Sequence, residues 1–121
     1  MRPEKFTQKM QEALHASQTV ASEFGHQEIT NEHFLIALLD QTDGVTRPLL
    51  EKLGVSADNL RSQLEADMNR RPQVHGSSDV RMGSELRQTL DAAEKEMTKL
   101  KDEFLSAEHY LLALSDSSSP F

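Results

Sequence analysis

Apolar residues recur near the start of the chain at the three- and four-residue spacing of one helical face. This stripe consists of Met10, Leu14, Ala21 and Phe24. The spacing predicts an amphipathic helix that begins after Thr7, whose hydroxyl can accept a hydrogen bond from a free amide of the first turn. Gly25 is expected to end the helix, because glycine adopts the positive φ found after a helix C-terminus without strain.

The segment from Phe34 to Leu39 is apolar on nearly every side instead of along one stripe. Thr30 is a natural N-cap for it, and Glu32 falls in the first turn, where a carboxylate meets the positive end of the helix dipole. We therefore expect a short helix that is buried on several faces and lies at the centre of the core.

Two further helices are predicted to follow. Pro48 stands just inside the start of the first one and Gly54 just past its end, which is typical of a short bracketed helix. Ser56 caps the next one, whose apolar face carries Leu60, Leu64 and Met68. Residues 72–81 contain proline, glycine and serine without an apolar period, so we expect a linker there.

The first half of this pattern then returns later in the chain. Glu108-His109 repeats Glu32-His33 at an offset of 76 residues (108 minus 32), and Ser106 takes the place of Thr30. Residues 82–100 repeat the first helix with an apolar stripe of their own, formed by Leu86, Leu90, Ala93, Met97 and Leu100. An internal repeat of this kind predicts an all-α domain built from two pseudo-twofold-related helical copies.

The repeat also predicts how residues 1–121 are divided within this one domain. Repeat one is expected at about residues 4–71, the linker at 72–81 and repeat two at 82–121. Counterparts of the third and fourth helices do not follow residue 114. Repeat two is therefore expected to be incomplete, as in an excised piece of a longer protein, and the fragment is expected to be a monomer.

Charge and composition narrow the classes of partner. The chain has 13 Lys and Arg against 20 Asp and Glu, a net charge of −7, which disfavours a nucleic-acid partner. No apolar run approaches the roughly 18 residues that cross a bilayer, so no membrane association is expected. Zero cysteines exclude disulfides and thiolate metal sites and favour a cytoplasmic protein.

The sequence offers no catalytic residues. A GxxxxGK motif followed by Ser or Thr is absent, as is a Gly-x-Ser-x-Gly elbow, so neither nucleotide binding nor a serine nucleophile is expected in this chain. The repeated Glu-His pair raises the alternative of a small helical metalloenzyme. Adjacent residues on a helix point about 100° apart, however, whereas helical carboxylate sites use Glu and His three residues apart. His33 and His109 are instead expected to bond to nearby backbone, and no metal is expected.

Several short motifs stand in a fixed order and at a doubled spacing: Phe6-Thr7, Gly25-His26, Glu32-His33, Pro48-Leu49-Leu50, Arg71-Pro72 and Glu108-His109. Together they resemble the double Clp-N repeat at the N-terminus of bacterial ClpB-type AAA+ disaggregases. The resemblance implies an all-helical domain that is joined in the full-length protein to ATPase rings, which thread aggregated polypeptide. ATP, magnesium and a homohexamer are implied only for that full-length protein, and no cofactor is expected in this chain.

The resemblance also implies a role and a site. The role is weak capture of unfolded or aggregated polypeptide, and the family's substrate contacts at the junction of the repeats match Thr7, Asp102, Glu108 and Tyr110. An alternative comes from the related ClpC- and ClpA-type unfoldases. There, acidic residues matching Glu32 and Glu108 are associated with phosphorylated arginine, and an adaptor protein is the other partner to consider. Two of these residues also have purely structural explanations, because Thr7 can serve as a helix cap and Glu108 as a charge in the first turn of a helix.

Overall fold

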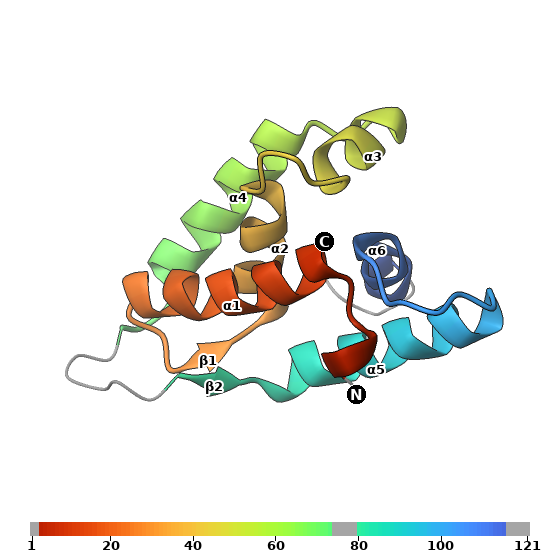
Figure 1. Cartoon of the computed structure of the whole chain (residues 1–121). Helices are drawn as coiled ribbons and strands as arrows, with labels where there is room; N and C mark the ends of the chain where they lie inside the picture. The colour runs from red at the N-terminus through yellow and green to blue at the C-terminus, as the bar shows by residue number, and fades with distance from the viewer. Residues whose placement is uncertain (1–2, 74–79, 116–121) are drawn as a thin grey trace.

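The computed structural model describes residues 3–73 and 80–115, and most of these residues are helical (Figure 1). The α-helices are α1 (Gln8–Glu23), α2 (Asn31–Leu39), α3 (Thr46–Lys52), α4 (Ala57–Arg70), α5 (Ser84–Lys99) and α6 (Ala107–Ser115). They confirm the all-α prediction. His75, most of the predicted linker and the serine-rich segment after Ser115 lie outside the described residues.

Each repeat is organised around a pair of packed helices. α1 packs against α2, and α5 packs against α6 (Figure 1). In repeat one, α3 and α4 also contact α2. Within the described part of the chain, no helix follows α6 to take the place that α3 and α4 have beside α2.

The core is centred on α2, as its apolar pattern predicts. Every residue from Asn31 to Leu39 is buried, because α1, α4 and α5 all contact this helix. The two repeats meet where the ring of Phe34 packs edge-on against the ring of Tyr110, with centroids 4.8 Å apart. This geometry is the preferred one for an aromatic pair, and it places the start of α6 against α2 in the middle of the molecule.

The predicted helix ends are confirmed in three places. The Thr7 hydroxyl accepts the Met10 amide at 3.2 Å, and Ser56 caps α4. Gly25 has a φ of 74°, as expected for the residue that follows α1. Its counterpart after α5 is Lys101, which adopts a φ of 62° although it carries a side chain. Repeat two therefore contains a local strain that repeat one avoids.

Residues 82–100 were expected to repeat the first helix, but Met82 is not helical. Arg81–Met82 forms a short strand, β2, that pairs in parallel with β1 (Glu28–Ile29). The amide of Gly83 donates to the Ile29 carbonyl at 2.9 Å, and α5 begins only after this bond. Two-residue strands carry too little periodicity to be found from the pattern of apolar residues.

The same pairing occurs a second time with the repeats exchanged. The Thr7 amide donates to the Leu105 carbonyl at 3.0 Å, and the Leu105 amide donates to the Lys5 carbonyl at 2.7 Å. The segment that leads into α1 therefore pairs with the segment that leads into α6, just as β2 pairs with β1. Each repeat thus supplies backbone hydrogen-bond partners to the other.

No helix within residues 3–73 and 80–115 combines the length and the apolar character needed to cross a membrane.

Candidate functional site

Two of the four predicted substrate contacts, Asp102 and Glu108, line the same surface pocket. This pocket has a volume of about 420 Å³ and lies between the end of α5 and the first half of α6. Its lining consists of Leu100, Asp102, Glu103, Phe104, Ser106, Glu108, His109 and Leu112. Thr7 is not in the lining, but its amide bonds to Leu105, which stands between the pocket residues Phe104 and Ser106.

The pocket combines exposed apolar side chains with negative charge. Leu100, Phe104 and Leu112 are 55%, 53% and 45% exposed, and all three belong to the lining. The acidic side chains of the lining are Asp102, Glu103 and Glu108. Exposed apolar side chains that gather at one place mark a surface suited to contact with another chain, and the carboxylates give that surface a preference for cationic groups.

A buried histidine holds the acidic rim in place. His109 Nδ1 accepts the Ser106 amide at 2.9 Å, which confirms the expected bond to nearby backbone. The other ring nitrogen, Nε2, then carries a proton and donates to Asp102 Oδ2 at 2.8 Å. Since the His109 side chain is buried and held at both nitrogens, it fixes the Asp102 carboxylate beside the start of α6.

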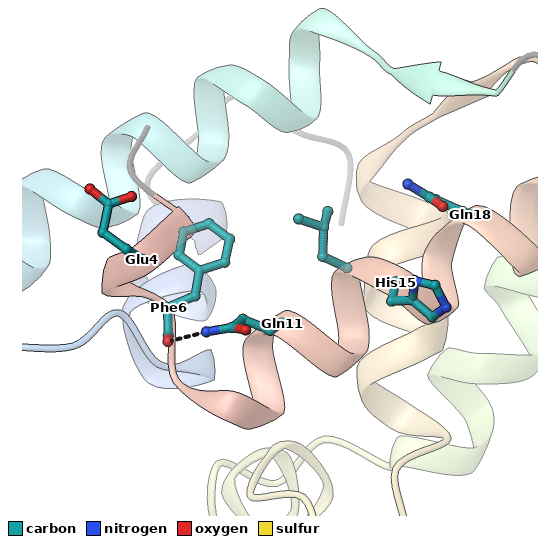
Figure 2. Close-up of a pocket in the computed structure, with 6 residues that line it drawn as sticks. Glu4, Phe6, Gln11, His15 and Gln18 are labelled. Carbon is teal, nitrogen blue, oxygen red and sulfur yellow. Dashed lines mark hydrogen bonds between the residues drawn. The ribbon is translucent and has the colours of Figure 1, made fainter.

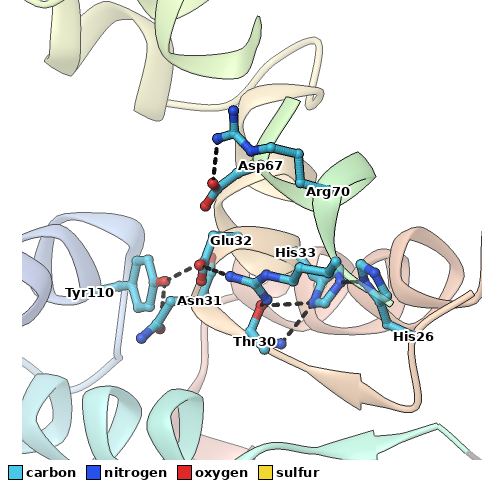
Figure 3. Close-up of polar contacts among 9 residues, drawn as sticks. His26, Thr30, Asn31, Glu32, His33, Asp67, Arg70 and Tyr110 are labelled. Atoms are coloured by element: carbon cyan, nitrogen blue, oxygen red, sulfur yellow. Dashed lines mark hydrogen bonds and ion pairs between the residues drawn. The ribbon is translucent and has the colours of Figure 1, made fainter. Parts of the chain in front are cut away.

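Tyr110 does not contribute to this surface, so its prediction as a direct substrate contact needs correction. The side chain is fully buried, and its hydroxyl donates to Asn31 Oδ1 at 2.9 Å (Figure 3). Burial, with Glu32 nearby, raises the pKa of Tyr110 well above its usual value, so the hydroxyl stays protonated and remains a donor. Asn31 in turn donates to Thr89 on α5 at 3.0 Å, which makes Tyr110 part of a polar link between the repeats.

The corresponding acidic residue of repeat one, Glu32, is already paired. Its carboxylate forms an ion pair with Arg71, the residue after α4, and Arg71 Nη1 also lies 3.3 Å from Thr30 Oγ1. The Glu32 side chain is only 10% exposed. A phosphorylated arginine could therefore reach Glu32 only by displacing Arg71, whereas Glu108 is exposed.

A pair of histidines, His26 and His33, lies beside this ion pair (Figure 3). His33 Nδ1 accepts the Thr30 amide at 2.8 Å, so His33 Nε2 carries the proton that it shares with His26 Nδ1, also at 2.8 Å. Burial, then the proximity of His26 and Arg71, lowers the pKa of His33 to about 4. Burial and Arg71 also lower the pKa of His26. Both rings are thus neutral near pH 7.

A second pocket, of about 360 Å³, lies along α1 (Figure 2). It is lined by Glu4, Phe6, Gln11, Leu14, His15 and Gln18. Gln11 Nε2 donates across it to the Phe6 carbonyl at 3.0 Å. Phe6 is itself buried, whereas Leu100, Phe104 and Leu112 of the pocket between α5 and α6 are exposed.

Metal binding finds no support in the parts of the chain that the structure describes. No group of three or more His, Asp or Glu side chains there is placed to hold an ion. Glu32 is engaged by Arg71, and His33 and His109 use both ring nitrogens for hydrogen bonds.

The apolar part of the pocket was not found by sequence reasoning. Leu100 belongs to the apolar stripe expected for its helix, and Leu112 lies in the second copy of the apolar central helix, so neither side chain was expected to be exposed. Ile36, which matches Leu112 at the 76-residue offset (112 minus 36), is buried, so the repeat by itself does not predict the exposure of Leu112.

Comparisons with known proteins agree with this fold. The family model of the Clp repeat (R) N-terminal domain matches residues 5–121. The chaperone protein ClpB of Vibrio cholerae is 38% identical over 121 residues, covering 99% of this chain and 14% of that protein. ClpB of Rhodopirellula baltica is 35% identical over 114 residues, covering 94% of this chain and 13% of that protein. The chain thus spans about one seventh of the length of these relatives.

Solved structures show the same architecture. The N-terminal domain of the ClpV1 ATPase from E. coli superposes with a TM-score of 0.86 at 23% identity, covering 95% of this chain and 70% of that one. The ClpV N-domain in complex with a VipB peptide gives a TM-score of 0.80 at 25% identity, covering 92% and 68%. With the family match over nearly all of its length, the chain belongs to the family of Clp repeat N-terminal domains, in the form found in ClpB chaperones.

Proposed function

We propose that this domain captures exposed segments of unfolded or aggregated polypeptide, weakly and reversibly, at the pocket between α5 and α6. One observation carries the proposal. The exposed side chains of Leu100, Phe104 and Leu112 line one pocket with Asp102 and Glu108, the two acidic residues already expected to touch substrate. A surface of this composition suits a segment that combines apolar and cationic residues.

The comparisons support a role in binding polypeptide. The curated relatives are ClpB chaperones, and a ClpV N-domain of the same fold has been solved with a VipB peptide. In this proposal the role of Thr7 is indirect, because its side chain caps α1 while its amide holds Leu105 beside the pocket.

The proposed capture is weak for a physical reason. A pocket of about 420 Å³ cannot bury the roughly 1,600 Å² that a stable protein–protein interface covers. Its use would be to raise the local concentration of substrate near the ATPase rings of the full-length protein. ATP hydrolysis, hexamer formation and a cytoplasmic location belong to the same proposal, for the longer protein rather than for these 121 residues.

A titration with a permanently unfolded polypeptide, followed by amide NMR, tests the proposal. The resonances expected to shift are those of residues 100–112. Phe104→Ser and Leu112→Ser should each weaken binding at least several-fold, since each removes apolar surface from the pocket. The matched control is Leu53→Ser, because Leu53 is 70% exposed at the end of α3, away from the pocket lining.

Two other results of this titration would contradict the proposal in different ways. Equal loss in Leu53→Ser and in the pocket variants would mean that binding follows general surface hydrophobicity and would reject the pocket. A folded domain with no shifts at all would reject direct capture. An adaptor protein would then be the better partner, and its stoichiometric co-purification with the full-length protein would be the next measurement.

A further inference from the structure

The two repeats hold their central histidines with different partners. At the offset of 76 residues, His33 corresponds to His109 and His26 to Asp102 (109 minus 33 and 102 minus 26). His109 Nε2 donates to the Asp102 carboxylate at 2.8 Å, whereas His33 Nε2 faces His26 Nδ1 at the same distance. A carboxylate stabilises a positive charge on the ring opposite, and a second histidine does not. The two repeats should therefore respond differently to acid.

The histidine pair of repeat one has no free position for a further proton. The lone pair of His33 Nδ1 faces the Thr30 amide at 2.8 Å, and the lone pair of His26 Nδ1 faces the proton on His33 Nε2. A solvent proton that forms an N–H bond at either atom sets a donor against a donor and breaks one of these hydrogen bonds. His33 is 0% and His26 9% exposed, so neither ring reaches water without a wider movement.

An added proton would also unbalance the charge of a buried cluster. At neutral pH this cluster consists of the two neutral rings, the Glu32 carboxylate and the Arg71 guanidinium, so its charges cancel. One more proton leaves a net positive charge in a site of low dielectric, where it is costly. The charged residues close by on the neighbouring elements reach solvent and are screened by it. They are Glu23 on α1, Glu28 on β1, and Asp67 and Arg70 on α4.

Arg71 is the member of the cluster that can leave it. Its side chain is 32% exposed, whereas that of Glu32 is 10% exposed. Departure of Arg71 to solvent would leave the negative Glu32 with the protonated histidine pair, so the charges in the interior would cancel again. Arg71 directly follows α4, and its departure would therefore act on the C-terminal end of that helix.

This end of α4 is fastened at the turn between α1 and α2. The contacts join Arg71 to Glu32 and Thr30, the Met68 carbonyl to the His26 ring, and Gln73 to Gly25. Most of them involve a member of the buried cluster. The histidine pair thus lies at the place where the end of α4 is attached.

We propose that the His26–His33 pair is a proton-sensitive latch for residues 64–71, the C-terminal end of α4. When the pair takes up a proton, Arg71 moves to solvent and residues 64–71 detach from α2. The face uncovered in this way is apolar, because Leu64 and Met68 are only 2% and 0% exposed while the latch is closed. The open form therefore offers unfolded polypeptide a second surface, and this device does not depend on capture at the pocket between α5 and α6.

Amide hydrogen exchange of the whole chain at pH 7 and pH 5, corrected for the intrinsic effect of pH, tests the latch. The pKa of His33 is about 4 in the closed form and 6.5 for a free ring. The opening constant of residues 64–71 should therefore rise about twentyfold between pH 7 and pH 5. Because a local opening exposes little surface, exchange there should hardly depend on low concentrations of urea. Exchange with the same rate and urea dependence as in α5 would mean that the whole domain unfolds, and would overturn the latch.

A variant that copies repeat two separates the histidine pair from other acid effects. His26→Asp sets a carboxylate opposite His33, as Asp102 stands opposite His109, so an added proton is neutralised and Arg71 stays in place. The rise in opening should then fall to about threefold or less. His15→Gln removes an exposed histidine of α1 and should keep the full rise. An undiminished rise in His26→Asp would overturn the latch, and if this variant does not fold, the urea dependence in the unchanged chain still decides.

A titration with a permanently unfolded polypeptide at the two pH values tests the uncovered surface. At pH 5 the unchanged chain should show added amide shifts at residues 30–39 and 64–71, and His26→Asp should not. Absence of these added shifts in a chain whose residues 64–71 do open would overturn the second surface. Shifts at residues 100–112, by contrast, bear only on capture at the pocket between α5 and α6.

Discussion

His33 Nε2 lies 2.8 Å from His26 Nδ1 in the interior of repeat one. The pair tolerates one proton between the two facing nitrogens, because the remaining nitrogen of His33 is occupied by the Thr30 amide. A second proton would place two donors against each other, close to the Arg71 guanidinium. Burial, followed by the proximity of His26 and Arg71, lowers the pKa of His33 to about 4.

Acid should therefore weaken the domain well before its carboxylates titrate. Unfolded His33 takes up a proton near pH 6.5, whereas folded His33 does so only near pH 4. Between these values the unfolded state binds more protons, so the free energy of unfolding falls as the pH falls. We expect His33 to account for a loss of about 2 kcal/mol between pH 7 and pH 5. Urea unfolding at pH 7 and at pH 5 measures this loss of free energy.

Two variants separate His33 from the other histidines. In His33→Gln the free energy of unfolding should be lower at pH 7 but change much less between pH 7 and pH 5. His15→Gln removes an exposed histidine from α1 and should keep the full acid dependence of the unchanged chain. An undiminished acid dependence in His33→Gln would show that another group is responsible.

Lys101 offers a site for stabilisation. Its φ of 62° places a side chain where glycine is favoured, and the equivalent residue of repeat one is Gly25, with a φ of 74°. Lys101→Gly should raise the free energy of unfolding by about 0.5 to 1 kcal/mol, because relief of the strain exceeds the entropy that glycine gives to the unfolded chain. Thermal unfolding of the two chains gives the comparison.

Gly25→Ala is the reverse kind of substitution, and it should have the opposite effect on stability. A Cβ there would stand 3.1 Å from Gln73 Cβ and would also adopt the unfavourable φ. Gly25→Ala is expected to lower the free energy of unfolding by about 1 kcal/mol or more. A Lys101→Gly chain no more stable than the unchanged one would indicate that the Lys101 side chain forms compensating contacts.

The ion pair between Glu32 and Arg71 should contribute far more to the free energy of unfolding than the neighbouring surface ion pair between Arg70 and Asp67. The Glu32 side chain is 10% exposed and that of Arg71 32% exposed. Arg71→Ala leaves a nearly buried carboxylate unpaired and should lower the free energy of unfolding by about 2 to 3 kcal/mol. A double-mutant cycle with Glu32→Gln should return a coupling of about 1 kcal/mol or more.

Arg70 is the matched control for this cycle. It precedes Arg71 directly and pairs with Asp67, but the two side chains are 73% and 47% exposed. Arg70→Ala should change the free energy of unfolding by less than about 0.5 kcal/mol. Similar losses for the two arginines would mean that Arg71 contributes only surface charge.

Much of the fold could be predicted from the sequence because its signals are local. Thr7 and Ser56 are caps, Gly25 has the positive φ that it was expected to supply, and the fully apolar segment from Phe34 lies at the centre of the core. The exchanged backbone pairing of the repeats could not be predicted. It joins residues such as Thr7 and Leu105 that are far apart in the chain and carries no period of its own.

The candidate site could likewise be predicted only in part from the sequence. Asp102 and Glu108 could be proposed as contacts from the family resemblance, and the structure places both in one pocket lining. Exposure, however, depends on what covers a helix. Tyr110 and Leu112 both belong to an apolar run, yet Tyr110 is buried against α2 while Leu112 is open. Only the packing of helices distinguishes the two.

The bond between Tyr110 and Asn31 gives a last prediction, which concerns communication between the repeats. Tyr110 follows Glu108 by two residues and Asn31 directly precedes Glu32, so the bond joins the first turns of the two central helices. Tyr110→Phe keeps the edge-on contact with Phe34 but leaves Asn31 Oδ1 without its donor. We expect a loss of about 1 to 2 kcal/mol in the free energy of unfolding.

The same variant should also disturb both first turns. Amide NMR of Tyr110→Phe is expected to show shifts at residues 30–33 as well as at 106–109, because Asn31 links the substituted hydroxyl to both Thr89 and the start of α2. Leu112→Ala, an exposed substitution on the same helix, should shift only residues of repeat two. If Tyr110→Phe leaves residues 30–33 unchanged, the two central helices are joined by apolar packing alone, and binding at the pocket of repeat two has no polar route to Glu32.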